Sequence, residues 1–347
     1  MEPTRLTGDR DAIGREHGRQ HADKIRDSIR VYDRLFRDFV GSSWSEARGM
    51  APRFLPAIER LFPDILDEVQ GIADGAGTDF DDILTLNCRS EISLTQASGG
   101  CSAFSLNQGG QWLAQNWDWR ADQQRNVVAL EIALAGQAPL ISVGEAGMVG
   151  KIGMNAHGLG VCLNAIRSQT CGDGLPIHFA LRKILECPDF AAARRVVDED
   201  RVASPAHFLI ASHDGQATGF EVHPGTPGEL PPQDGKVLHT NHLYAEATAA
   251  CVNDFPRPDS PVRLSRLRQL LDRPIASEPG ALFDLLSDHA NAPSAICRHT
   301  NHELPEAERM ETLFAVVMNL NERRLHLRLG KPCEAGEAME VELELAG

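Results

Sequence analysis

Apolar side chains in the first hundred residues recur at the spacing of amphipathic helices. Between Asp11 and Val40 they lie three or four positions apart with charged residues between them. The same pattern continues over residues 43–60 and 62–73, where prolines interrupt it. The sequence therefore predicts a helical N-terminal segment over residues 1–100.

A different pattern begins at about residue 100, where short apolar stretches alternate with Gly, Asn and Gln. Such stretches predict consecutive antiparallel hairpins, with strands at 101–107, 110–116, 127–134, 139–143, 151–155 and 158–164. A proline-rich loop is predicted after residue 222. Further helices are predicted at 176–187, 189–198, 260–272 and 279–289, and further strands at 205–213, 218–222, 312–320, 324–329 and 337–345. This order favours an α+β fold in which helices cover two antiparallel sheets.

The net charge of the chain limits the kinds of molecule that it is expected to bind. Its 347 residues hold 34 Lys and Arg against 49 Asp and Glu, a formal net charge of −15. Such a chain repels phosphate backbones and anionic lipid, so we expect neither a nucleic-acid nor a membrane partner. No apolar run reaches the roughly 18 residues of a membrane span, and the N-terminus has no apolar signal core, which predicts a cytoplasmic protein.

Eight cysteines are spread along the chain without any C-x-x-C pair, which removes the main support for a zinc ribbon. Several of them lie in apolar stretches and are expected to be buried, reduced thiols. Cys101 differs because it directly follows Gly99 and Gly100 and opens a predicted strand. Glycine permits a strained backbone, and a thiol beside a distorted peptide bond can attack the carbonyl before it. Three of the four tryptophans, at 112, 117 and 119, fall in the same hairpin.

Three motifs give this region a specific resemblance. They are Gly100-Cys101, Ala-Gln-Asn-Trp-Asp-Trp at 114–119 and Leu-His-Thr-Asn-His at 238–242. Together they resemble the isopenicillin-N acyltransferase family, the acyl-coenzyme A:6-aminopenicillanic-acid acyltransferases and their bacterial relatives, within the N-terminal-nucleophile (Ntn) hydrolase superfamily. Weaker matches lie at Gly14-x-x-x-Gly18, at Gly-Leu-Gly-Val-Cys-Leu-Asn (158–164) and at Ile-Cys-Arg-His (296–299).

The resemblance implies a four-layer αββα sandwich made as an inactive precursor. It implies self-cleavage between Gly100 and Cys101, leaving a helical fragment of residues 1–100 and a catalytic fragment of residues 101–347. The two fragments would fold as one unit and stay paired without a covalent bond. Cleavage would free the α-amine of Cys101, whose reference pKa is about 7.7–8.0, and this amine can take the thiol proton.

The same resemblance assigns roles to other residues. Asp118 would hydrogen-bond the α-amine of Cys101, and the side-chain amide of Asn241 would donate to the oxyanion of the tetrahedral intermediate. Asn164 would supply a second donor, and Arg298 would brace the amine–carboxylate pair or bind an acidic substrate. For Asn164 and Arg298 an ordinary capping or surface role remains open.

The predicted function is that of an autoprocessed cysteine Ntn hydrolase. It would cleave the acyl group from a small N-acylated amide or thioester substrate, or transfer it to an amine, without metal or organic cofactor. The acyl group and its acceptor stay open. No G-x-G-x-x-G or P-loop motif supports a nucleotide cofactor.

Three alternatives compete with this function. A metal enzyme would use the two His-Thr-Asn-His segments at 239–242 and 299–302. A papain-like thiol hydrolase would pair Cys101 with His239 or His242, and its cysteine should begin a helix. The third alternative is a catalytically silent binding protein of the same fold.

Overall fold

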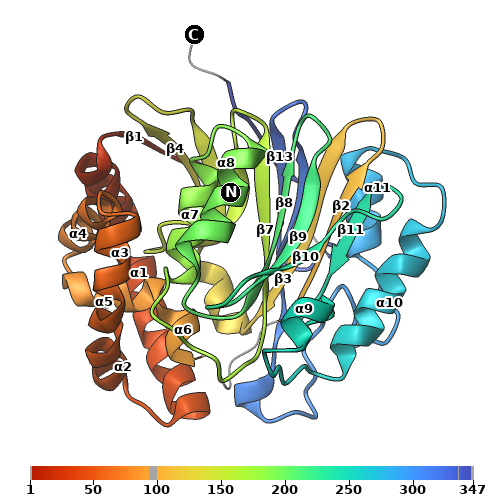
Figure 1. Cartoon of the computed structure of the whole chain (residues 1–347). Coiled ribbons are helices and arrows are strands. Elements are labelled where there is room, and N and C mark those ends of the chain that lie inside the picture. The colour runs from red at the N-terminus through yellow and green to blue at the C-terminus, as the bar shows by residue number, and fades with distance from the viewer. Residues whose placement is uncertain (1, 94–99, 335, 345–347) are drawn as a thin grey trace.

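Two β-sheets face each other at the centre of the molecule, and helices cover the outer face of each (Figure 1). The computed structural model describes residues 2–93, 100–334 and 336–344. The strands are β1 (Thr4–Gly8), β2 (Gly100–Asn107), β3 (Gln111–Trp119), β4 (Val127–Leu134), β5 (Leu140–Glu145), β6 (Ile152–Asn155), β7 (Leu159–Ala165), β8 (Ala206–Ser212), β9 (Ala217–Val222), β10 (Gly228–Leu230), β11 (Lys236–His239), β12 (Glu311–Asn319), β13 (Arg324–Leu329) and β14 (Met339–Glu342). The helices are α1 (Arg10–Val40), α2 (Trp44–Met50), α3 (Leu55–Leu61), α4 (Ile65–Ala76), α5 (Phe80–Asn87), α6 (Arg89–Ser93), α7 (Ile177–Leu185), α8 (Phe190–Arg195), α9 (Glu246–Ala249), α10 (Asp259–Leu271) and α11 (Pro279–Leu286).

The eight-stranded sheet has the order β1-β4-β5-β6-β7-β8-β9-β10, and the six-stranded sheet has the order β11-β2-β3-β12-β13-β14. Helices α7 and α8 pack on the outer face of the first sheet, and α10 and α11 on the outer face of the second. The predicted four-layer α+β sandwich is therefore confirmed. Strand β2, which carries Cys101, lies inside the second sheet between β11 and β3.

The sequence-based prediction was wrong at two places in the first sheet. Thr4–Gly8, predicted as part of the helical segment, forms β1 and pairs parallel with β4, so this sheet is not wholly antiparallel. Its five residues bury Leu6 alone and carry too little periodicity to reveal a strand. The predicted proline-rich loop contains β10, an edge strand next to Pro227 and Pro231, where a missing amide hydrogen costs no sheet bond.

The N-terminal helices pack against one another beside the two sheets, and the backbones of α1 and α4 come into close contact (Figure 1). A Cβ at Gly14 would lie 2.3 Å from the carbonyl oxygen of Glu68, and one at Gly18 would lie 2.2 Å from that of Ile72. Only glycine therefore lets α1 approach α4 this closely. The Gly14-x-x-x-Gly18 motif of the sequence is a helix-packing motif here.

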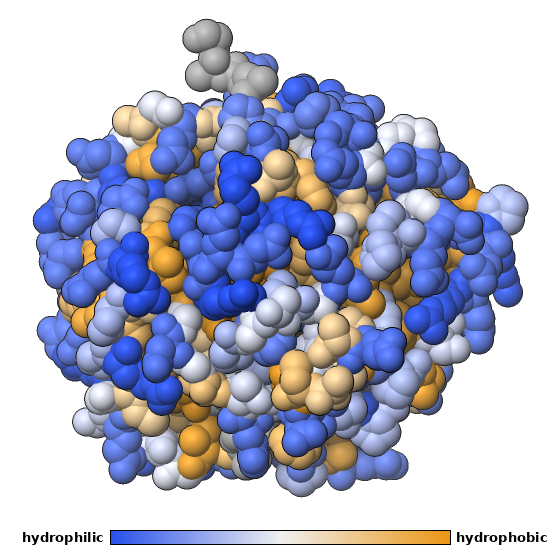
Figure 2. Space-filling model, in the orientation of Figure 1, coloured by the Kyte–Doolittle hydropathy of each residue, from blue (hydrophilic) through white to orange (hydrophobic). Residues whose placement is uncertain are grey.

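The outer surface is mostly polar. On the face shown in Figure 2, hydrophilic residues cover most of the area and hydrophobic ones form small separate patches. Among the described residues, no helix combines the length and apolar character needed to cross a membrane.

Candidate active site

Cys101 is the second residue of β2 and is buried, with 2% of its surface exposed. Its main-chain N–H donates to Oδ1 of Asn241 over 2.8 Å. Burial and the nearby carboxylate of Asp118 raise the pKa of the Cys101 thiol, while the main chain of Ala165 opposes this shift. In the intact chain the thiol is therefore a poor nucleophile until a base takes its proton.

Asp118 lies directly across the sheet from Gly100, because β3 continues to Trp119, beyond the predicted end of this strand at residue 116. Its carboxylate accepts from Oγ1 of Thr312 over 2.7 Å and from Nε of Arg298 over 3.2 Å. Burial raises the pKa of the Asp118 carboxyl, and Arg298 opposes the shift. Asp118 thus lies against Gly100 in the intact chain, and its role at the α-amine of Cys101 stays a prediction.

The structure gives Gly100 a reason to be glycine other than the strained backbone that the sequence suggested. Gly100 is not among the glycines with a positive φ. Instead, a Cβ at this position would lie 2.3 Å from Oδ2 of Asp118 and 2.9 Å from Nε of Arg298. The strand needs glycine here to let the carboxylate lie against the backbone. Gly99 lies outside the described residues.

Asn241 follows β11 and reaches the start of β2 from the neighbouring strand. Its Oδ1 accepts from Cys101 N–H and, over 2.9 Å, from Nη2 of Arg263, while its Nδ2 donates to the carbonyl of Ala165 over 2.9 Å. These three partners fix which end of the amide is oxygen. One amide hydrogen remains available on Nδ2, so the oxyanion role of Asn241 stays a prediction.

Asn164 is close to this site but turned differently from the expected orientation. Its Oδ1 faces Nδ1 of His207 at 2.9 Å on the adjacent strand β8. Because side chains alternate along a strand, its neighbours Leu163 and Ala165 line the pocket instead. Its role as a donor stays a prediction that this geometry does not favour.

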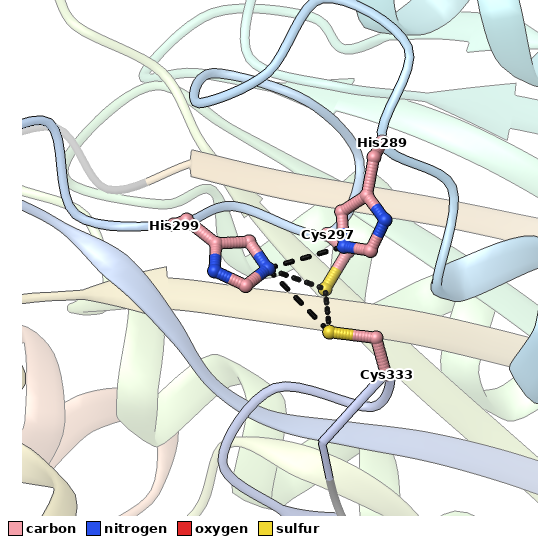
Figure 3. Close-up of side chains that lie close together, drawn as sticks. All are labelled: His289, Cys297, His299 and Cys333. Atoms are coloured by element: carbon pink, nitrogen blue, oxygen red, sulfur yellow. Dashed lines mark hydrogen bonds between the residues drawn. The ribbon is translucent and has the colours of Figure 1, made fainter.

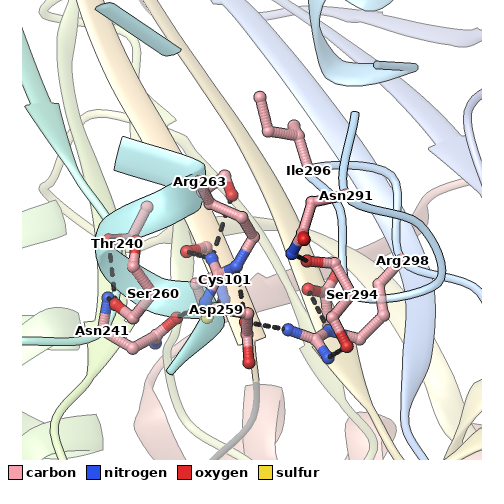
Figure 4. Close-up of polar contacts among 12 residues, drawn as sticks. Cys101, Thr240, Asn241, Asp259, Ser260, Arg263, Asn291, Ser294, Ile296 and Arg298 are labelled. Carbon is pink, nitrogen blue, oxygen red and sulfur yellow. Dashed lines mark hydrogen bonds and ion pairs between the residues drawn. The ribbon is translucent and has the colours of Figure 1, made fainter. Parts of the chain in front are cut away.

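Arg298 is joined at the site by two residues that the sequence analysis did not select. Asp259 accepts from Nη2 of Arg298 and, over 2.9 Å, from Nε of Arg263 (Figure 4). Nη1 of Arg263 donates to the carbonyl of Cys101 over 2.6 Å. Asp259 directly precedes the predicted helix at 260–272, and Arg263 lies four positions further on, a spacing typical of surface ion pairs. Only the packing of α10 on β2 turns this pair inward.

The histidines of the alternatives point away from Cys101. Nε2 of His239 lies 3.0 Å from a carboxylate oxygen of Glu221, and Nδ1 of His242 lies 2.8 Å from Oγ of Ser260. Within the described residues, no histidine hydrogen-bonds Cys101 or lines its pocket. Cys101 also begins a strand and not a helix, so the papain-like arrangement lacks both of its expected features.

A pocket opens beside the Cys101 thiol. Its lining residues come from both sheets and from the N-terminal helices: Arg89, Ser90, Ser93, Cys101, Trp117, Trp119, Lys151, Leu163, Ala165, Ile166, Ile177 and Pro205. Nζ of Lys151 lies 3.1 Å from the centre of the Trp117 ring, and burial lowers the pKa of this lysine to about 7. Glu145 pairs with Lys151 over 2.8 Å and with Arg89 over 2.9 Å. Glu145 is one carboxylate beside two basic side chains, and much of the remaining wall of the pocket is aromatic and aliphatic.

The αββα sandwich is the fold that the resemblance to Ntn hydrolases implies. The chain belongs to the acyl-coenzyme A:6-aminopenicillanic acid acyl-transferase family, whose sequence model matches residues 105–334. The family prediction is therefore confirmed.

Individual relatives agree with this assignment. The chain is 28% identical over 326 residues to the acyl-coenzyme A:6-aminopenicillanic-acid-acyltransferase 40 kDa form of Emericella nidulans, covering 92% of this chain and 90% of the relative. A similar solved structure is an N-acylethanolamine-hydrolyzing acid amidase ortholog from Caenorhabditis elegans, with TM-score 0.47, 13% identity and coverage of 64% of this chain and 93% of that chain. A variant of conjugated bile acid hydrolase from Clostridium perfringens has TM-score 0.45, 11% identity and coverage of 70% and 92%. These two structural similarities are distant, and the family assignment does not depend on them.

Proposed function

We propose that this member of the family is an autoprocessing cysteine acyltransferase or amidase whose nucleophile is Cys101. The observation that carries the proposal is the position of Cys101. Cys101 lies at the start of a central strand, and this residue lines a pocket. Its main-chain N–H donates to Asn241, and the glycine before it lies against the Asp118 carboxylate.

Processing would begin with attack by Sγ of Cys101 on the carbonyl carbon of Gly100. The S–C bond forms, the C–N bond breaks, and the thiol proton passes to the departing nitrogen, which becomes the α-amine of Cys101. Water then hydrolyses the thioester, giving the carboxylate of Gly100 and restoring the thiol. The products are a fragment of residues 1–100 and a fragment of residues 101–347.

After cleavage the α-amine would serve as the base for each turnover. Asn241 Oδ1 already accepts from the same nitrogen in the intact chain, so the amine has an orienting partner at once. Asp118 would hold the charge of the protonated amine. The free N–H of Asn241 and the main chain of Ala165, which favours the ionised thiol, are the donors we assign to the oxyanion.

The two fragments would remain together through contacts that do not involve the cleaved bond. Strand β1 pairs with β4 across the cleavage point. Buried ion pairs join Arg10 to Glu186 over 2.6 Å and Glu68 to Arg182 over 2.7 Å. Losing one partner of such a pair leaves a buried charge uncompensated, which opposes separation of the fragments.

The pocket indicates the kind of acyl group. Trp117, Trp119, Leu163 and Ile166 give apolar walls next to the thiol, which suit an aromatic or aliphatic acyl chain. The relative's name includes an acyl-coenzyme A donor, and we extend acyl thioesters and acyl amides to this chain as substrates. The acceptor of the acyl group, water or an amine, stays open. A cytoplasmic location stays a prediction.

Intact-mass measurement of the purified protein tests the proposal. Wild type should give two fragments, the larger beginning at Cys101, and Cys101→Ala should remain one chain without turnover. Cys162→Ala is the matched control, because Cys162 is also buried on a nearby strand and should process normally. An intact wild-type chain, or cleavage of Cys101→Ala at the same bond, would overturn the proposal, and the former would favour the silent binding protein.

A further inference from the structure

A second cluster of reactive side chains lies outside the pocket. His289, Cys297 and His299 come from the segment between α11 and β12, and Cys333 follows β13. Their four ligand atoms all lie within 4.8 Å of one another, the one such group of three or more found in the part of the chain that the structure describes. Figure 3 shows the side chains converging from the two segments on a common point.

The spacing of these atoms matches a tetrahedron. Nε2 of His289 lies 3.1 Å from Nε2 of His299, and Sγ of Cys297 lies 3.5 Å from Sγ of Cys333. Nε2 of His299 lies 3.4 Å from Sγ of Cys333 and 3.9 Å from Sγ of Cys297. With Zn–S about 2.3 Å and Zn–N about 2.0–2.1 Å, tetrahedral edges are about 3.8 Å between sulfurs, 3.3 Å between nitrogens and 3.5 Å between unlike atoms. These four of the six edges lie within about 0.4 Å of the ideal values, and the other two are no longer than 4.8 Å.

The chemistry of the donors selects the metal. Two thiolates and two imidazoles are a structural zinc set, whereas magnesium and calcium prefer oxygen ligands.

The surroundings of the cluster also fit a metal. Oε1 of Glu334 lies 3.7 Å from Nδ1 of His299, the ring nitrogen on the far side from the cluster. A carboxylate in this position commonly orients a ligating imidazole. His289 and Cys333 are exposed, which provides a path for the ion to enter.

We propose that His289, Cys297, His299 and Cys333 bind one zinc ion. Four protein ligands close the coordination sphere, so the ion is structural and not catalytic. This departs from the function predicted from the sequence, which had no metal, and from the metal-enzyme alternative, which used the two His-Thr-Asn-His segments. Only His299 of those segments belongs to the cluster.

The site has a consequence for Arg298, which stands between two of the ligands. Its main-chain N–H donates to Oγ1 of Thr312 over 2.9 Å, and the same hydroxyl donates to Asp118. Cys297 and His299 flank Arg298, so a zinc ion bound by them and by Cys333 would tie this segment to the residues after β13. This link would hold the Arg298 guanidinium against Asp118. The binding of zinc itself does not depend on the role proposed for Cys101.

Zinc content of the full-length protein, purified under reducing conditions, tests this inference. Wild type should carry about one zinc ion per chain, and zinc titration of chelator-treated protein should restore it. Cys333→Ser and His299→Gln should lower the zinc affinity more than about a hundredfold, since even an outer-shell change costs 10–100-fold. The matched controls are Cys171→Ser, another exposed cysteine, and His302→Gln, the other histidine of the same His-Thr-Asn-His segment.

Two further measurements keep the test decisive if a variant folds poorly. Cobalt substituted into wild type should show the visible absorption of a tetrahedral site with thiolate ligands. Chelation should lower the Tm of wild type, and added zinc should restore it. Absence of bound zinc in reduced wild type, full zinc content in both ligand variants, or a Cys297–Cys333 disulfide under reducing conditions would overturn the proposal.

Discussion

Gly100→Ala tests whether the close contact between Gly100 and Asp118 matters for processing. The new Cβ would lie 2.3 Å from Oδ2 of Asp118, whereas ordinary contact begins at 3.4 Å, so one side must move by about 1 Å. The carboxylate is not free to move, because Thr312 and Arg298 hold it at 2.7 and 3.2 Å. Each of these charge-assisted bonds is worth about 1.5–3 kcal/mol.

The expected result follows from this geometry. A displacement of about 1 Å at a reacting centre costs about a hundredfold in rate, so Gly100→Ala should process about a hundredfold more slowly than wild type. Overpacking of this kind should also lower the stability by about 1–3 kcal/mol, measured in a Cys101→Ala background where the chain stays intact. The assay is a time course of intact mass on freshly purified precursor.

Two variants separate the explanations. Gly49→Ala is the control glycine, since a Cβ there meets nothing within 4 Å, and it should process normally. Thr312→Val removes one anchor of Asp118 without touching the scissile bond, so it should also slow processing if the carboxylate position matters. Processing of Gly100→Ala within threefold of wild type would refute the reasoning. Slow Gly100→Ala with normal Thr312→Val would assign the effect to hindrance of the thiol.

Two further predictions concern charge. Asp118→Asn should shift the acid limb of the kcat/KM profile of processed enzyme to lower pH, because a nearby carboxylate raises the pKa of the α-amine; an unmoved limb would separate Asp118 from the amine. Glu145→Gln should cost about 3–5 kcal/mol in urea unfolding of the Cys101→Ala chain, since Lys151 and Arg89 lose their buried counter-charge. Glu131→Gln, which breaks a pair with the exposed Arg5, should cost at most about 1 kcal/mol, and an equal loss in both variants would contradict the argument.

Much of the fold could be predicted because its signals are local. The periodicity of α1, the alternation of β2 and the apolar runs of β8 and β12 are visible in short windows, and their ends lie within a few residues of the predicted ones. β1 and β10 were missed because each has few residues, and β1 also depends on β4, a partner strand distant in sequence. The extension of β3 to Trp119 was missed for the same reason, because pairing with β2 and β12 overrides the polar residues.

The site was predictable only where a motif marks it. Cys101, Asp118, Asn241 and Arg298 come together as the resemblance implied. Arg263 carries no such mark. Its carbonyl contact at Cys101 arises because α10 packs on β2 from a position 162 residues away in sequence.

The metal cluster shows the same limit. Its ligands stand at irregular intervals, and Cys333 joins the other three only because β13 returns beside the segment before β12. Spacing rules for zinc motifs describe ligands on one compact turn or hairpin, so they do not detect a site assembled across a sheet.

The balance of charge predicts how the proposed cleavage would change this site. Around Cys101 the intact chain places two carboxylates, Asp118 and Asp259, with two guanidinium groups, Arg298 and Arg263. Self-cleavage would add an α-amine and a carboxylate to this balanced network. As long as the new Gly100 carboxylate stayed near the amine, it would favour the protonated amine, which cannot accept the thiol proton. When that carboxylate departs, Asp118 remains as the counter-charge that we propose. With one nearby carboxylate in place of two, the pKa of the amine falls toward its ordinary value. Under the proposed mechanism, full activity therefore requires both cleavage of the bond and withdrawal of the new C-terminus from the site.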